Sequence, residues 1–190
     1  SVKPDETVIF NKENPMTLKS TFFAAGIIAS FASFAQAENP ADLNDLQIAH
    51  VAYIADNIDI RYAHLALAIS SNPAIHTFAQ TMIRDHTAVN EQALALLAKL
   101  EAQPQDNVRS QSLQDNAEKI ITEMSMVRGA ECDKFSAAHE LAYHKAVNDL
   151  VGKTCSPNIE NVEVKAWFEA GLEIFKAHEH HADMMVADLK

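Results

Sequence analysis

The sequence has few of the residues that tight turns require. Its 190 residues include 4 glycines and 6 prolines, too few for the many short strands of a β-sandwich or β-barrel. Helix formers such as alanine, leucine, glutamate and lysine are abundant instead. We therefore expect an all-α protein, and the chain length suits one domain with a sizeable core.

Positive charge is also scarce. The chain has 15 Lys and Arg residues against 26 Asp and Glu residues, which gives a formal net charge of −11 at pH 7, and it contains no basic run. Such a charge repels nucleic acid and anionic lipid but attracts cations. We expect no nucleic-acid partner. The nine histidines all follow residue 37, and this density indicates metal or proton chemistry.

The motifs of several common enzyme classes are missing. The sequence has no nucleophile elbow, glycine-rich phosphate loop or paired-cysteine zinc motif. Its two cysteines, Cys132 and Cys155, flank a helix expected over residues 132–151. That helix would be about 30 Å long, whereas a disulfide needs Cα atoms within about 7 Å. We expect the two cysteines not to pair within one chain.

One long uncharged apolar run occurs, near the N-terminus. Residues 16–37 combine Lys19 in a short polar start, an apolar run over residues 22–35 and the small-x-small ending Ala35-Gln36-Ala37. This order is typical of a secretory signal peptide. The run is shorter than the roughly 20 residues of a transmembrane helix, so we expect no stable membrane insertion after cleavage.

The signal peptide implies where the protein works. We predict cleavage before Glu38 and export to the periplasm of a Gram-negative bacterium, with residues 38–190 forming the folded domain. Residues 1–15 precede the first methionine and carry three acidic residues, unlike the positive start of a signal peptide. They look like an upstream extension of the gene without fixed structure.

Four long segments show apolar residues at the 3.6-residue period of a helix. Polar or proline-containing breaks separate them, and Asn72-Pro73 is a favourable start for the second helix. We expect long helices over residues 42–70, 73–101, 132–151 and 162–189, a shorter one over 112–127, and a loop over 152–161. Two hairpins joined by a crossover of roughly 30 residues have the connectivity of a ferritin-like up-down four-helix bundle with one long crossover.

Each long helix places a histidine or an acid among apolar residues of its buried face. A buried charge needs a partner or a metal, so these residues are expected to meet. The candidate metal ligands are Asp59, His86, Glu140, His144, His178 and His181. Five other histidines lie on helix faces that mix polar and apolar residues, and they are not expected as ligands: His50, His64, His76, His139 and His180.

Helix geometry gives a rough check of depth in the bundle. Asp59 and His86 each lie about 14 residues from the first turn, so both sit about 20 Å from that end and should face each other. His144 lies about 12 residues before Ser156, in the middle of the expected loop, and His178 lies about 22 after it. His144 and His178 lie at the same depth in the bundle only if the loop is placed asymmetrically between the two helices.

Two interpretations of these residues remain open. Neutral imidazole with a few carboxylates suits zinc, iron, copper or nickel, and metal affinity is then expected to fall as the histidines protonate near pH 6. The alternative is a buried polar network that fixes the register of the helices.

Three motifs carry a resemblance to a known family. They are LALAISSNPAIHTFAQTMIRDHTAVN at 65–90, CDKFSAAHELAYHKAV at 132–147 and AHEHHA at 177–182. Through them, residues 42–189 resemble periplasmic ferritin-like proteins catalogued as a domain of unknown function and often labelled outer membrane proteins. The resemblance implies a four-helix bundle, export, and a role in stress resistance or metal handling.

The chain departs from related patterns at several positions. Asp59 stands where the resembled family commonly has Glu, and Cys132 where it commonly has an aromatic residue. Di-iron ferritins use Glu from two helices and Glu-x-x-His from the other two. The second helix has no such unit, and the third spaces Glu140 and His144 four apart. A ferroxidase is therefore not expected, whereas a rearranged metal site is compatible with the sequence.

Three functions follow as hypotheses. The first is an exported metal-binding protein that acts in metal handling or stress protection. The second is a metalloenzyme that processes oxygen or peroxide at the same residues and needs an open coordination position and a cavity. The third is a non-catalytic interaction or structural module with a buried polar network. The sequence does not decide between an enzyme and a binding protein, and it does not indicate the oligomeric state.

Overall fold

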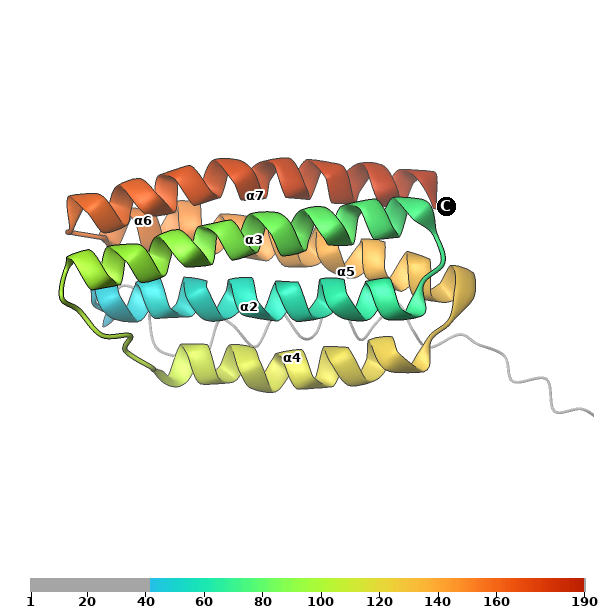
Figure 1. Ribbon diagram of the computed structural model, residues 1–190, viewed down its shortest axis with the longest axis horizontal. Coiled ribbons are helices and arrows are strands. Elements are labelled where there is room, and N and C mark those ends of the chain that lie inside the picture. Colours follow the sequence, from blue (N-terminus) through green and yellow to red (C-terminus); the bar gives the residue numbers. More distant parts are fainter. Residues whose placement is uncertain (1–41, 190) are drawn as a thin grey trace, which may run out of the picture.

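The structure is a computed structural model and describes residues 42–189, a range that contains helices and connecting segments but no strand. The expectation of an all-α protein is confirmed for this range. The main helices are α2 (Asp45–Ile69), α3 (Pro73–Lys99), α4 (Val108–Met126), α5 (Gly129–Leu150) and α7 (Val162–Asp188), and the short elements η3 (Val151–Cys155) and α6 (Ser156–Asn158) follow α5 (Figure 1).

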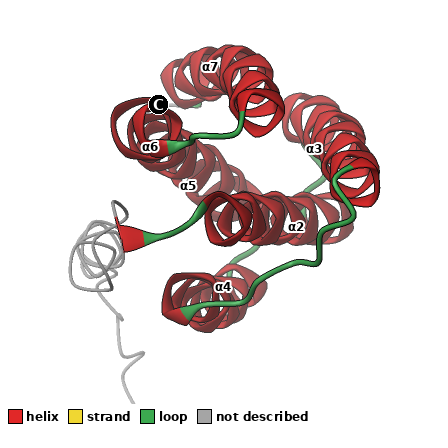
Figure 2. Cartoon of the chain, turned by 90° about the vertical axis from the view of Figure 1, so that its left-hand side faces the viewer, coloured by secondary structure: helices red, strands yellow, loops and turns green. Residues whose placement is uncertain are grey.

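The long helices lie side by side with roughly parallel or antiparallel axes. Helix α2 packs against α3, α5 packs against α7, and α3 and α7 close the arrangement. Seen along the axes, these four helices surround a common interior, and α4 covers the outer side of α2 (Figure 2). The connection between the two hairpins is therefore a fifth packed helix. It begins at Val108, four residues earlier than the sequence predicted.

Asparagine caps start four of the five long helices. Asn44, Asn72, Asn107 and Asn161 each accept hydrogen bonds from the backbone N–H groups of the first helical turn. These N–H groups have no partner inside the helix, so a side-chain acceptor there stabilises it. The predicted start of the second helix at Asn72-Pro73 is confirmed. Helix α5 begins differently, at Gly129, whose φ of 59° turns the chain directly out of α4.

The prediction of a loop over residues 152–161 is wrong, because the chain stays helical through Asn158. Val151, Cys155 and Ile159 are all buried. Their four-residue spacing continues the apolar face of α5 past its nominal end, so burial favours a helix here. The true turn is therefore confined to residues 159–161.

This extension also corrects the depth of the second hairpin. With the turn centred near Glu160, His144 lies about 16 residues before it and His178 about 18 after it. The two histidines consequently sit at the same level of the bundle, as Asp59 and His86 do on the first hairpin.

Several sequence predictions concern residues that the structure does not describe. The upstream extension over residues 1–15, the signal peptide over 16–37 and its cleavage site lie outside the described range. Within that range, Cys132 and Cys155 are buried free thiols. No helix between residues 42 and 189 has both the length and the apolar character to cross a membrane.

Candidate metal centre

Five of the six predicted ligands meet inside the bundle. Asp59 from α2, His86 from α3, Glu140 and His144 from α5, and His178 from α7 are all buried. We call these five residues the core cluster. Two groups within it bring ligand atoms to within 4.8 Å of one another. They are His86, His144 and His178, and Asp59, Glu140 and His144.

His86 lies between two carboxylates of α2. Its Nδ1 is 2.8 Å from Asp56 Oδ1, and its Nε2 is 2.6 Å from Asp59 Oδ2. Asp56 and Asp59 are three residues apart, so they lie on the same face of α2. The imidazole also stacks on the ring of Phe175, with centroids 4.8 Å apart and an angle of 11° between the planes. Both nitrogens and the plane of the ring are thereby fixed.

His144 is fixed by its own helix. Its Nδ1 donates to the backbone oxygen of Glu140, one turn earlier, at 3.0 Å. This leaves Nε2 directed toward Asp59, with 4.0 Å between Nε2 and Asp59 Oδ2. The exposed fraction of the His144 side chain is 1%, so water does not compensate for a missing partner.

His178 is fixed by a residue at the protein surface. Its Nε2 lies 2.9 Å from Oδ2 of Asp85 on α3. Asp85 is half-buried and is held in turn by Arg84, which donates to it from Nε and Nη2 at 2.6 and 3.0 Å. Asp85 thus links the α7 histidine to α3 and to the solvent.

The three histidines share one arrangement of nitrogen atoms. One ring nitrogen of each is anchored by a carboxylate or a carbonyl oxygen, which fixes the orientation and tautomer of the ring. The other nitrogens are His86 Nε2, His144 Nε2 and His178 Nδ1. All three are buried. His86 Nε2 lies 2.6 Å from Asp59 Oδ2, whereas His144 Nε2 and His178 Nδ1 have no hydrogen-bond partner within residues 42–189. Metal-bound histidines characteristically have one anchored and one free nitrogen.

The pKa values of the two acids of the core cluster shift in opposite directions. Burial, followed by the neighbouring Asp59 carboxylate, raises the pKa of Glu140 well above its usual range. Burial alone would raise the pKa of Asp59 as well, but the charge and hydrogen bond of His86 lower it overall. Glu140 therefore holds a proton more readily than Asp59 does.

The pKa values of the three histidines of the core cluster also shift in different directions. Burial disfavours a charged His86, but the carboxylates of Asp59 and Asp56 outweigh it and raise its pKa to about 10. Burial lowers the pKa of His144 to about 4, and it also lowers the pKa of His178. At pH 7 the metal-free cluster therefore holds one cationic histidine and two neutral ones.

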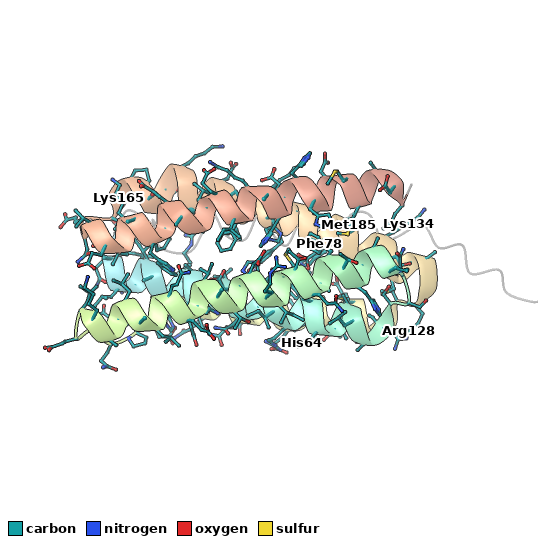
Figure 3. The ribbon with its side chains drawn as sticks, turned by 45° about the horizontal axis from the view of Figure 1, so that its top comes forward. His64, Phe78, Arg128, Lys134, Lys165 and Met185 are labelled. Atoms are coloured by element: carbon teal, nitrogen blue, oxygen red, sulfur yellow. The ribbon has the colours of Figure 1, made fainter. Side chains whose placement is uncertain are left out.

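His181, the sixth predicted ligand, is not brought into the core cluster. It lies three residues beyond His178, about 4.5 Å further along α7. Its half-buried ring meets the edge of Phe78 with centroids 5.0 Å apart. Phe78 and Met185 lie in the seam between α3 and α7 (Figure 3). His181 is in neither ligand group found among the described residues.

Asp56 and Asp85 were not among the residues predicted from the sequence, and His139 was assigned to a mixed face although it is buried. Asp56 could have been found by its three-residue spacing from Asp59. His139 is buried against Tyr62, with ring centroids 4.6 Å apart, and burial lowers its pKa to about 4. The other histidines not expected as ligands lie outside the core. His64 and His180 are exposed, and His50 and His76 are partly buried.

The chain was compared with known proteins. Residues 30–185 match a family described as Domain of unknown function (DUF4142). Comparison with curated proteins gave no match. Comparison with solved structures gave none either. The family match covers most of the chain and every residue of the core cluster, and it confirms the expected resemblance to a domain of unknown function. The chain belongs to the DUF4142 family.

Proposed function

We propose that this chain is an exported metal-binding protein whose ferritin-like helical bundle holds a transition-metal ion in the core cluster. His86, His144 and His178 would supply nitrogen ligands and Asp59 an oxygen ligand, with Glu140 beside them. Neutral imidazole with carboxylate suits iron, zinc or copper. The pattern of a signal peptide at residues 16–37 supports export, and handling of metal or protection against metal-driven stress is the role proposed.

One observation carries this proposal. Two anchored histidines, His144 and His178, each keep a buried nitrogen that has no hydrogen-bond partner in the described part of the chain. A third histidine, His86, directs its Nε2 at the Asp59 carboxylate of the same cluster. Leaving a buried polar atom unsatisfied costs roughly 1–3 kcal/mol, and the Asp59 carboxylate lies among these nitrogens, with Oδ2 4.0 Å from His144 Nε2. A single metal ion would satisfy these atoms together.

Elemental analysis of protein purified without chelator tests the proposal. We expect about one metal ion per chain in the wild type, and its loss in His144→Ala and in His178→Ala. His64→Ala is the matched control, because His64 is an exposed histidine of α2, and it should keep the metal. Equal metal content in all four proteins, or no metal in the wild type even after addition of iron, zinc or copper, contradicts the proposal.

A cavity supports a second candidate function, the processing of oxygen or peroxide. A space of about 280 Å³ is lined by Asp56, Tyr143 and Phe175, which all contact residues of the core cluster. Such a space would let a small reactant approach the metal. Consumption of peroxide by the metal-loaded protein, lost in His144→Ala, would favour this function over simple binding.

The metal-free charges favour a third candidate, a purely structural network. His86 already forms an ion pair with Asp56 and Asp59, and such a pair can fix the register of two helices without any metal. A wild-type protein that binds no metal, together with strong destabilisation by His86→Ala, would establish this function in place of the first two.

A further inference from the structure

The core cluster is closed to solvent, so an ion that binds there must cross a shell of side chains. Its five residues are each at most 5% exposed. Moving a bare cation through apolar side chains costs far more than moving it past a group that replaces part of its hydration shell. The route of entry should therefore be marked by a polar side chain that contacts both the cluster and the solvent.

Two spaces in the described part of the chain reach the cluster, and neither suits a cation. The cavity of about 280 Å³ has a mostly aliphatic and aromatic wall, and its one acid, Asp56, is only 3% exposed. A second space, beside Glu140, has a volume of about 10 Å³ and so holds about one water molecule at most. A small neutral molecule could use the cavity, whereas a hydrated ion needs a polar route.

Asp85 of α3 provides such a route. Its side chain is 21% exposed, and its Oδ2 lies 2.9 Å from Nε2 of His178. By contrast, the acids Asp56, Asp59 and Glu140 are all buried. A carboxylate at the surface attracts divalent cations and can replace water in their coordination shell.

His178 joins Asp85 to the rest of the cluster. While Nε2 is directed at Asp85, the centroid of its ring lies 5.3 Å from that of His86 and 5.4 Å from that of His144. These three histidines form one of the two ligand groups of the cluster. An ion held by Asp85 is thus separated from that group by a single side chain, which is itself a ligand.

Arg84 covers the Asp85 carboxylate. Its Nε donates to Asp85 Oδ1 at 2.6 Å, and its Nη2 donates to Asp85 Oδ2 at 3.0 Å. A metal ion must displace this guanidinium before it can bind Asp85. The Arg84 side chain is 71% exposed, and an ion pair so open to water is weak and separates readily. Arg84 therefore has the features of a removable cover.

We propose that Asp85 is the entry ligand of the core cluster. A divalent transition-metal ion displaces Arg84, binds the Asp85 carboxylate and then passes along His178 to His86 and His144. This inference rests on the proposed function, but it concerns how fast the ion moves and not whether it binds. Metal content at equilibrium decides the proposed function, and the rates of binding and release decide the entry route.

Stopped-flow mixing of the chelator-treated full chain with Co²⁺ tests the route. Cobalt reports its own binding by its visible absorbance, and mixing the loaded protein with excess chelator gives the dissociation rate. In Arg84→Gln we expect association and dissociation both to be at least about threefold faster, with little change in their ratio. A cover on the path slows both directions, because entry and exit use the same path.

Two more variants sharpen the test. Asp85→Asn removes the charge but keeps an oxygen that can accept from His178, and its association rate should be at least about tenfold slower. Arg61→Gln is the matched control, because Arg61 forms a surface ion pair with Glu118 at 2.7 Å between α2 and α4, and it should leave both rates unchanged. Circular dichroism melting confirms that each variant is folded. Arg84 is exposed, so its variant tests the route even if Asp85→Asn does not fold.

Three results overturn the entry route. They are rates in Arg84→Gln equal to those in Arg61→Gln, faster dissociation without slower association in Asp85→Asn, and association that is slowed by filling the cavity in Ala146→Phe instead of by Asp85→Asn. The second result would leave Asp85 with a positioning role only. A wild type that binds no metal at equilibrium rejects the proposed function and the route together, whereas normal binding with unchanged rates in the variants rejects the route alone.

Discussion

Under the proposed function, His86 is the residue at which protonation and metal binding compete. Its position between Asp56 and Asp59 keeps it protonated at pH 7, with a pKa of about 10. A metal ion needs the lone pair of Nε2, so it must displace this proton. The imidazolium is thus the internal cation of the metal-free protein, and a divalent ion that displaces its one proton raises the local charge by one.

This competition gives the first prediction, and it corrects the pH range expected from the sequence. Metal affinity should rise with pH from about 5 to about 10 as His86 loses its proton, because protonation of His144 begins only near pH 4. No separate step is expected near pH 6. Calorimetry at pH 7 in buffers of different ionisation enthalpy should show release of about one proton per metal ion bound.

The opposite result is easily recognised. Binding without proton release at pH 7, or affinity that levels off above pH 7, would mean that His86 is not a ligand. A His86→Ala variant is the control, because its metal affinity should be weaker and should lose this pH dependence.

Asp85 gives the second prediction. It orients His178 through a 2.9 Å contact with Nε2 while remaining outside the cluster. Loss of such an outer partner commonly weakens metal binding by about 10- to 100-fold, and we expect this range for Asp85→Ala. The matched control is Asp115→Ala, since Asp115 is an exposed acid of α4. Competition with a coloured chelator measures both affinities, and equal values for the two variants would contradict the assigned role.

At the scale of the elements, the asparagine caps explain where the helices begin. The third prediction concerns Asn161, which accepts hydrogen bonds from the N–H groups of Glu163 and Val164 at the start of α7. Asn161→Ala should lower the free energy of unfolding by about 1 kcal/mol. Asn158→Ala is the control, because the exposed Asn158 side chain donates to the Thr154 carbonyl oxygen without capping a helix, and it should cost less. Urea unfolding measures both, and an equal loss would argue against the cap.

The elements also show what could be predicted from the sequence. Each long helix has one stripe of apolar residues, and the side chains on that stripe face the core. The stripes therefore predicted the long helices and four inward-facing residues, namely Asp59, His86, His144 and His178. The chain beyond residue 151 was misjudged, because Gly152 and Pro157 suggested a break. Pro157 lies in the first turn of α6, where a proline is tolerated.

His139 was misjudged for a different reason. The sequence shows a helix with a mixed face but does not show how many neighbours cover it. In the fold, α5 contacts α2 and α4 as well as α7, so a second face is buried, and His139 meets Tyr62 there. Tertiary packing of this kind leaves no periodic signal in one sequence.

At the scale of the whole molecule, the charged state of the core makes stability depend on pH. The folded pKa of His86 lies above the unfolded value of about 6.5, so its contribution is full below pH 6.5 and disappears as pH rises through about 10. Glu140, whose folded pKa is also raised, acts in the same direction. The fourth prediction is that metal-free protein loses at least about 1 kcal/mol of stability per pH unit between pH 7 and 9.

Urea unfolding of chelator-treated protein at pH 7, 8 and 9 measures this slope. His86→Gln lacks the titrating ring and should show a shallower slope. Stability that stays level or increases from pH 7 to 9 in the wild type would contradict the assigned charges.

The ligands of the core cluster are divided between the two hairpins. The pair α2 and α3 carries Asp59 and His86, and the pair α5 and α7 carries Glu140, His144 and His178. Neither hairpin contains either of the two ligand groups complete, so the proposed metal would be captured only after both hairpins have docked. Under the proposed function, a chain that crosses a membrane before it folds would take its ion from the compartment in which folding is completed. The identity of the metal would then be decided by where the protein folds as well as by the chemistry of its ligands.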